Sequence, residues 1–297
     1  MYAQNVSLVW IVVCLGGVLT VWAWIRLGSR VRGTTLEDVR IWQAVAGLAA
    51  MAAAIVHARH AAEDHAEIVR FFAAGALFCP NMALLGAKRP QHRAWHLVVA
   101  TLWLIIALPA CEAAWLGDGR SWQTGAVRGG FLWVLVALEL LNRVGTGAEL
   151  AGIAMAVAEV LLLGTFLPGW GGAHDGWGPP VALLAVAVQQ WECWRTARMP
   201  SAPVNLNSAW RAFKRRFGFL WALRVWVRIN AACQTENWPV VLGWSGFCDE
   251  RGAPVDPARV LAPQQYQALC QTFVNLVRRF ESAELVEQLR RGASTAD

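Results

Sequence analysis

The sequence contains little charge. Only 15% of its 297 residues are Asp, Glu, Lys or Arg, whereas roughly 25% is usual for a soluble domain. Hydrophobic residues make up 57% of the chain, and 18 residues are tryptophan. This composition excludes a disordered chain and argues against a soluble globular fold. It indicates a polytopic membrane protein whose apolar helices cross the bilayer.

The sequence also lacks the short motifs of several enzyme classes. It has no glycine-rich nucleotide loop, no G-x-S-x-G and no H-E-x-x-H. Its 7 cysteines form no C-x-x-C pair, which excludes a zinc ribbon and a thioredoxin-like site. The lysines, Lys88 and Lys214, lie outside the last apolar stretch, which excludes a retinal Schiff base there. The net charge of +6 is typical of cytoplasmic anchoring, and we expect no nucleic-acid partner.

Seven apolar stretches predict transmembrane helices. The N-terminal segment has neither a basic region nor an A-x-A cleavage site, so we expect the first stretch to be a retained helix and not a signal peptide. The predicted spans are residues 7–25, 38–58, 66–86, 94–116, 124–142, 148–167 and 179–198. The expected fold class is therefore an all-α membrane protein with about seven transmembrane helices in residues 1–198.

The positions of Lys and Arg predict the orientation of these spans. Segments on one side of the membrane hold ten of these residues, and segments on the other side hold four. Because basic residues accumulate on the cytoplasmic side, the N-terminus is expected outside and the C-terminus inside. We therefore expect a multi-pass protein of the cell inner or plasma membrane, with the lipid bilayer as its first partner.

The composition changes after the last span. Residues 199–207 are typical of a linker, and residues 208–297 predict a small, mostly helical cytosolic tail with a short extended segment at 238–247. The start of the tail is basic and aromatic, which predicts a helix lying on the inner leaflet. Its expected membrane-surface residues are Arg211, Lys214, Arg215, Arg216 and Trp221, with Trp210, Phe213 and Phe217 partly inserted.

A polar site is predicted inside the membrane. Glu159 and the neighbours Gln189 and Gln190 lie at similar distances from the outer prolines of the last two spans, so we expect them to meet near mid-bilayer. Glu159 shares a helical stripe with Gly152 and Ala156, where small residues allow close helix packing. Since a charged carboxyl in lipid is unfavourable by about 2.5 kcal/mol or more, Glu159 is expected to face protein. It would serve a proton or cation relay, or a neutral Glu–Gln hydrogen bond between helices.

Two further features of the apolar region are polar. Glu139 and Arg143 are four residues apart and, with Asn142, predict a paired cluster at the inner end of the fifth span. Pro80, followed by Asn81, interrupts the third span and predicts either a kink or a broken helix that lines a transport site.

The hairpin between the second and third spans predicts a divalent-metal site. Its candidate ligands are His57, His60, Asp64 and Glu67, which would share one helical arc. Two other readings stay open: Asp64 and Glu67 have the spacing of a capping box, and the hairpin could simply be a solvated loop with local ion pairs.

Three classes of function follow from these features. The first expectation is a membrane scaffold that binds a cytosolic protein through its tail. The alternative is a translocator of a small solute, a proton or an ion at the Glu159 site. The third is a metal-dependent membrane enzyme that uses the outer histidines; apart from that metal, the sequence predicts no cofactor and no catalytic residue.

Overall fold

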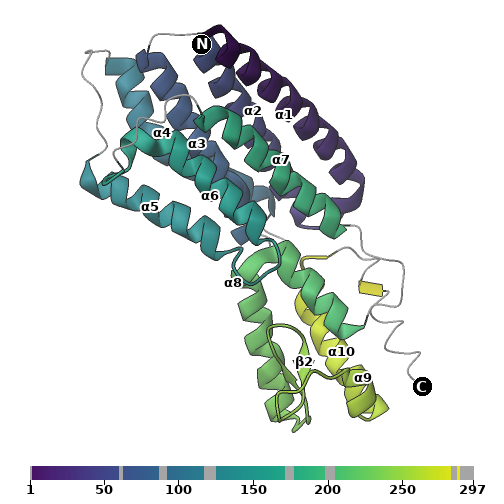
Figure 1. The fold of residues 1–297 in the computed structure, drawn as a ribbon. Helices are drawn as coiled ribbons and strands as arrows, with labels where there is room; N and C mark the ends of the chain where they lie inside the picture. The colour runs from purple at the N-terminus through teal and green to yellow at the C-terminus, as the bar shows by residue number, and fades with distance from the viewer. Residues whose placement is uncertain are drawn as a thin grey trace.

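A computed structural model describes residues 2–59, 63–86, 92–116, 125–170, 177–197, 205–281 and 286–287. Most of these residues are helical (Figure 1). The bundle helices are α1 (Tyr2–Val31), α2 (Leu36–Ala58), α3 (Glu63–Leu85), α4 (His92–Leu116), α5 (Ala126–Leu141), α6 (Glu149–Leu163) and α7 (Gly178–Ala197). A short 3₁₀ turn, η1 (Gly164–Phe166), follows α6.

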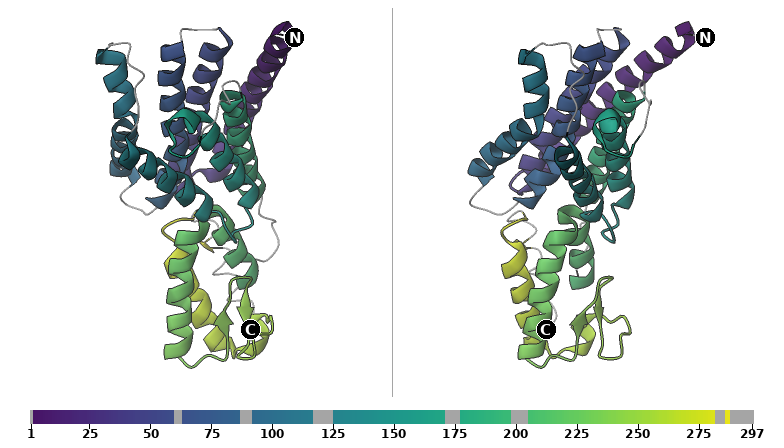
Figure 2. Two further views of the ribbon diagram at one scale, coloured as in Figure 1. Left: turned by 60° about the vertical axis from the view of Figure 1, so that its left-hand side comes forward. Right: turned by 90° about the vertical axis from the view of Figure 1, so that its left-hand side faces the viewer.

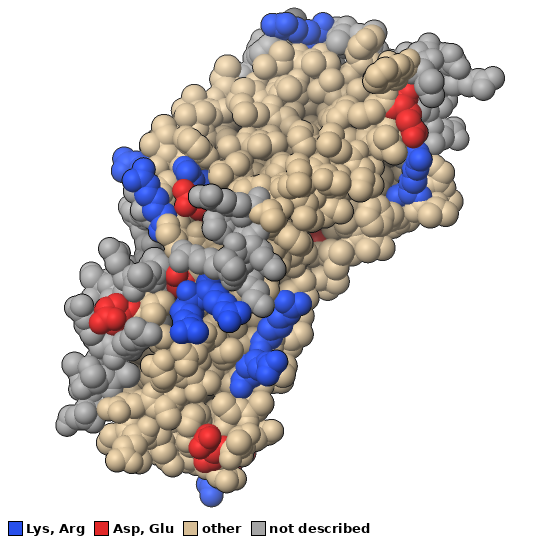
Figure 3. Space-filling model, turned by 180° about the vertical axis from the view of Figure 1, so that it is seen from behind, with Lys and Arg blue, Asp and Glu red and all other residues tan. Residues whose placement is uncertain are grey.

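Four of the described helical segments are long and apolar enough to cross a membrane: Leu36–Ala58, His65–Leu85, Ala94–Trp115 and Glu149–Phe166. Large apolar side chains also point outward from these helices, such as Leu48, Leu104 and Ile153. Few charged side chains interrupt the surface of the bundle seen in Figure 3. Exposing so large an apolar surface to water would be unfavourable, so the protein is a helical, membrane-embedded protein.

Small residues hold the bundle together. Helix α2 packs against α1, α3 and α7, and α6 packs against α3, α5 and α7 (Figures 1 and 2). Alanines fill many of these contacts, among them Ala46 and Ala50 of α2 and Ala73 of α3, which are fully buried. At Gly47, where α1, α2 and α7 meet, an added Cβ would lie 2.9 Å from Thr20. Small residues allow this close approach, which drives helix association in lipid.

The C-terminal part forms a second lobe at the end of the bundle opposite the N-terminus (Figure 2). It contains α8 (Leu206–Thr235), β1 (Val241–Leu242), β2 (Phe247–Cys248), α9 (Pro257–Val260) and α10 (Pro263–Val277). The two strands pair antiparallel within the region predicted to be extended. Helix α8 bends at Gly218, which has a left-handed φ of 79°. The residues around this bend reach the bundle, and α8 packs on α10.

The aromatic side chains of α8 form the core of this lobe. Trp210, Phe213 and Phe217 are at most 2% exposed, and Trp221 is 8% exposed. The rings of Phe213, Phe217 and Trp221 all contact Phe280. The prediction that these side chains insert into a lipid leaflet is therefore wrong. The segment after α10 offers them a protein partner, which sequence spacing alone does not reveal.

Candidate functional site

Glu159 lies on the face of α6 that packs against α5. Gly152 of α6 approaches α5 so closely that an added Cβ would lie 2.6 Å from the Cβ of Arg143. Ala156 and Glu159 follow Gly152 on the same helical stripe. Glu159 is completely buried, as expected of a carboxyl that avoids lipid. The small-residue stripe therefore turns Glu159 toward α5.

A second carboxyl, Glu139, lies on the facing side of α5. It is 1% exposed and sits one turn before Arg143, whose Nε is 4.0 Å from its Oε1. Because α5 and α6 run antiparallel from the contact between Arg143 and Gly152, this turn brings Glu139 toward Glu159, and the two carboxyls interact electrostatically. We call Glu139 and Glu159 the acid pair; Arg143 is the arginine beside it.

The acid pair has one cation for two carboxyls. Within the described part of the chain, neither the oxygens of Glu139 nor those of Glu159 accept a hydrogen bond. Two negative charges close together in a medium of low dielectric repel by several kcal/mol, and Arg143 can neutralise only one of them. The arrangement favours one carboxylate paired with Arg143 and one carboxyl that holds a proton. Chemically, it can take up and release a single proton.

Gln189 and Gln190 are buried in α7, at 1% and 0% exposure, but neither forms a hydrogen bond with Glu159. The start of α7 lies beside the end of α6, because an added Cβ on Gly178 would lie 3.1 Å from the carbonyl oxygen of Leu161. Measured from this contact at 1.5 Å per residue, Gln189 lies about 13 Å farther along the bundle than Glu159. The prediction that they meet at one depth is therefore wrong.

The physical reason is the end of α6. The sequence predicts that the span continues to Pro168, but the α-helix ends at Leu163 and tightens into η1. Pro168 then packs beside Gly129 of α5, where an added Cβ would lie 2.5 Å from the proline ring. The depth of Glu159 in the bundle therefore cannot be counted in helical residues back from Pro168.

Gln190 belongs to a separate buried polar group where α2 and α7 meet. Gln190 shares a face of α7 with Val186 and Cys193. Val186 lies beside Gly47 of α2, and Cys193 accepts a hydrogen bond from Gln43 of α2, so Gln190 faces α2. Side-chain polar atoms of Thr20, Gln43, Gln189 and Gln190 are buried without a hydrogen-bond partner in the described residues. The sequence gives no signal for Gln43, because a single amide in an alanine-rich helix matches no motif.

Asn142, at the end of α5, connects the bundle to the tail. Its Nδ2 donates to Oδ1 of Asn81 in α3 at 2.7 Å. Its backbone carbonyl accepts from the amide of Phe219, and its Oδ1 accepts from the amide of Leu220, both just after the bend in α8. Helix α3 continues through Pro80, so the proline does not break it. Asn142 therefore joins α3, α5 and α8 one residue away from Arg143.

Four of the five predicted membrane-surface residues have partners within the protein. Arg215 pairs with Glu192 and Arg216 with Glu281, each at 2.9 Å. Lys214 donates to the carbonyl of Trp244, and burial lowers the pKa of its ammonium group below the usual lysine value. The indole of Trp221 donates to the carbonyl of Leu84. The contacts of Arg215 and Trp221 join the tail to the bundle, whereas those of Lys214 and Arg216 lie within the tail. Arg211 is exposed, and its role at a membrane surface stays a prediction.

The predicted metal ligands are only partly described. His60 and the side chain of Asp64 lie outside the described residues. His57 lies at the end of α2, and Glu67 of α3 is 3.7 Å from Arg70. Among the described residues, no group of three His, Cys, Asp or Glu side chains comes together. A metal site at this hairpin stays a prediction.

Comparison with known proteins adds no functional assignment. No family model, no curated protein and no solved structure matches this chain. Its function is therefore inferred from the chemistry of the buried polar residues.

Proposed function

We propose that the protein crosses the membrane seven times, with the N-terminus outside and the tail in the cytoplasm of a cell bounded by an inner or plasma membrane. Helices α1 to α7 coincide with the seven apolar stretches. The N-terminus and the tail lie at opposite ends of the bundle, as an odd number of crossings requires (Figure 2). The excess of Lys and Arg on the tail side supports the orientation.

Within this topology, we infer that the protein translocates protons, with the acid pair as the proton-binding site. The observation that carries this inference is the burial of two carboxyls, Glu139 and Glu159, beside one arginine. Ionisable residues inside a membrane bundle are unfavourable, and they are characteristic of proton relays. A single excess acid can be protonated from one side of the membrane and deprotonated to the other.

A proton suits this site better than a metal cation. Alkali and alkaline-earth ions need several oxygen ligands around them. Among the described residues, this site offers two carboxyls as ligands, and Arg143 beside Glu139 would repel a cation. A proton needs only one carboxyl oxygen. The buried glutamines on α7 lie toward the tail and would extend a polar path in that direction, since each carries unpartnered polar atoms.

Proton flux into liposomes containing the purified protein tests this function. We expect an imposed proton gradient to dissipate faster with the wild-type protein than with empty liposomes. Glu159→Gln and Glu139→Gln should each lower this flux at least tenfold, because an amide cannot release a proton. Glu112→Gln is the matched control, since Glu112 is an acid on the exposed surface of α4. Equal flux in wild type and both buried variants would refute the proposal, and flux carried by Na⁺ or K⁺ in its place would reassign the site to a cation.

A second candidate, an interaction scaffold with a cytosolic partner, is favoured by one observation. Leu220, Leu223 and Val227 form an apolar stripe along α8 and are each at least 36% exposed. Their spacing is that of a helix face that binds another helix. A photoreactive residue at position 223 should cross-link a protein partner in cells, and the same residue at the exposed position 236 should not.

A further inference from the structure

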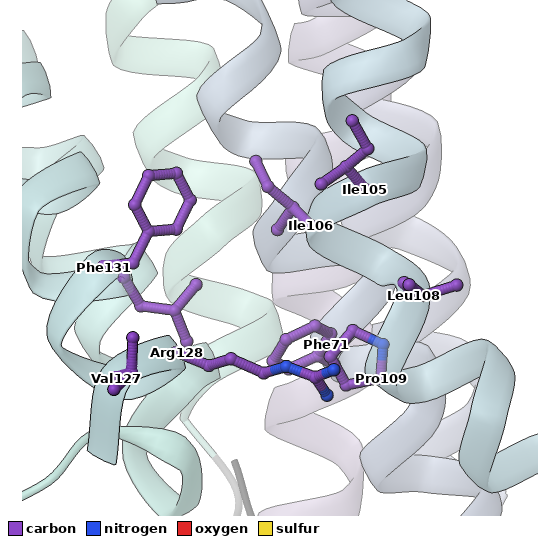
Figure 4. Close-up of a pocket in the computed structure, with 9 residues that line it drawn as sticks. Phe71, Ile105, Ile106, Leu108, Pro109, Val127, Arg128 and Phe131 are labelled. Carbon is purple, nitrogen blue, oxygen red and sulfur yellow. The ribbon is translucent and has the colours of Figure 1, made fainter. Parts of the chain in front are cut away.

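A cavity of about 370 Å³ lies between α4 and α5 (Figure 4). Its lining residues are Phe71, Ile105, Ile106, Leu108, Pro109, Val127, Arg128, Phe131 and Leu132. Although α4 and α5 are consecutive, they do not pack closely against each other in the described part of the chain. Phe71 of α3, which is 1% exposed, lies at the back of the cavity.

The cavity opens on the apolar outer surface of the bundle. Ile105, Leu108, Val127 and Phe131 line it and are between 48% and 88% exposed. In a membrane, such an opening faces the acyl chains of lipids. Pro109 lies in the wall of α4, where it removes the helical hydrogen bond to the carbonyl of Ile105 and favours a bend. The opening is therefore accessible from within the bilayer and not from water.

One end of the cavity carries a positive and a negative side chain. Arg128, near the start of α5, reaches across toward Pro109 of α4, as Figure 4 shows. Its NH1 atom is 3.4 Å from Oε2 of Glu112, and both side chains are about half exposed. Glu112 is one turn from the end of α4 and Arg128 is two residues into α5, so the ion pair lies near the end of the bundle that holds the N-terminus. The other end of the cavity, around Ile105 and Phe131, is apolar.

We propose that this cavity binds one acyl chain of a phospholipid whose headgroup is phosphoethanolamine. The acyl chain occupies the apolar part, since ligand cavities of roughly 300–1,000 Å³ hold molecules of this kind. The phosphate accepts hydrogen bonds from the guanidinium of Arg128. The ammonium donates to the carboxylate of Glu112, so the lipid inserts between the two side chains and replaces their mutual ion pair.

The charges distinguish this headgroup from two common alternatives. A phosphoglycerol headgroup carries a negative phosphate but no positive group for Glu112, whose charge would repel it. A phosphocholine headgroup carries a positive charge, but its three methyl groups leave no N–H to donate to a carboxylate. Phosphoethanolamine alone among these three offers both an acceptor for Arg128 and a positively charged N–H donor for Glu112.

Lipid retention by the purified full-length protein tests the proposal. The protein is exchanged into an equimolar mixture of phosphatidylethanolamine, phosphatidylcholine and phosphatidylglycerol of identical acyl chains, and the lipids that remain bound are identified by native mass spectrometry. We expect one phosphatidylethanolamine per chain, enriched about tenfold over the others. Arg128→Gln should abolish this retention, and Val127→Trp should reduce it by filling the opening. Glu112→Gln should retain lipid but lose the preference for ethanolamine.

The control is Arg59→Gln, because Arg59 is an exposed arginine at the end of α2, away from the cavity. It should leave lipid retention unchanged. Equal retention of all three lipids by the wild type would overturn the proposal, as would wild-type behaviour of both Arg128→Gln and Val127→Trp. The altered residues are exposed, so thermal unfolding close to that of the wild type confirms that loss of lipid is not loss of fold. The result is independent of proton flux, because the cavity does not include the acid pair.

Discussion

At the scale of single residues, the bundle contains two kinds of buried polar side chain. Asn142 is fully engaged, with partners in α3 and α8, whereas Glu159 accepts no hydrogen bond from the described residues. A buried polar group contributes to stability only when it is hydrogen-bonded, and an unpartnered one is unfavourable. Asn142 therefore stabilises the fold, whereas Glu159 adds no hydrogen bond to it.

Replacing each residue by leucine separates these two roles. Glu159→Leu should leave the free energy of unfolding unchanged or raise it slightly, since the substitution removes an unpartnered buried carboxyl. Asn142→Leu should lower it by about 1–3 kcal/mol, because Asn81 and the amide of Leu220 lose their partner. Thermal unfolding of both variants in one detergent measures the difference. A larger loss in Glu159→Leu than in Asn142→Leu would contradict the assignment.

The burial of Glu159 could be predicted from its sequence, but its partner could not. The unfavourable energy of a carboxyl in lipid and the stripe of Gly152 and Ala156 are local properties of α6. The proximity of Glu139 depends on the register between α5 and α6, which the contact of Gly152 with Arg143 sets. That contact joins two helices across a turn, and neither helix alone specifies it.

At the scale of the secondary-structure elements, the bend in α8 attaches the tail to the bundle. Gly218 has a φ of 79°, and an added Cβ would lie 2.7 Å from Oδ1 of Asn142. A tryptophan indole strengthens the same junction, since Trp221 of α8 donates to the carbonyl of Leu84 in the last turn of α3. A carbonyl in the last turn of a helix lies where the intrahelical hydrogen bonds end, and the indole offers it a donor.

Gly218→Ala should therefore weaken this junction. Both the left-handed conformation and the contact with Asn142 oppose a methyl group, and we expect a loss of about 1–3 kcal/mol. Limited proteolysis should then cleave the tail faster than in the wild type. Gly130→Ala is the control, since a Cβ at Gly130 has open space around it and lies within a helix. Protection of the tail equal to that of the wild type in Gly218→Ala would argue against this role of the bend.

The helices themselves were largely predictable, because hydrophobic stretches of the required length mark them. Their ends were less so. The sequence gives no sign that α6 stops at Leu163 or that α7 begins beside Leu161, and it therefore predicts a partner for Glu159 in α7 and not in α5. The aromatic character of α8 was evident from sequence, but its burial depends on Phe280, which is more than 50 residues away.

At the scale of the whole molecule, charge separates the two ends from the apolar middle. Lys and Arg gather where the bundle meets the tail, and the surface between the ends is nearly free of charge in the view of Figure 3. Arg215 and Arg216 at this junction are paired with acids, whereas Arg211 is exposed. Such a distribution predicts a cytoplasmic position for the junction.

Reporter fusions at the two termini test this topology. An enzyme that is active only in the cytoplasm should be active when fused after residue 297 and inactive when fused before residue 1. An enzyme that is active only outside should give the opposite pattern. Activity of the cytoplasmic reporter at both ends would indicate an even number of crossings and would contradict seven spans.

The most direct test of the proton-binding role is infrared spectroscopy of the purified protein in lipid. A protonated carboxyl absorbs at a different infrared wavenumber from a carboxylate. We propose that Glu139 and Glu159 share one proton. At neutral pH we predict a protonated-carboxyl band that shifts in ²H₂O. The band should be lost or altered in Glu159→Gln and in Glu139→Gln, and it should persist in Glu112→Gln. A wild-type spectrum without this band, or a band unaffected by both buried substitutions, would contradict the account.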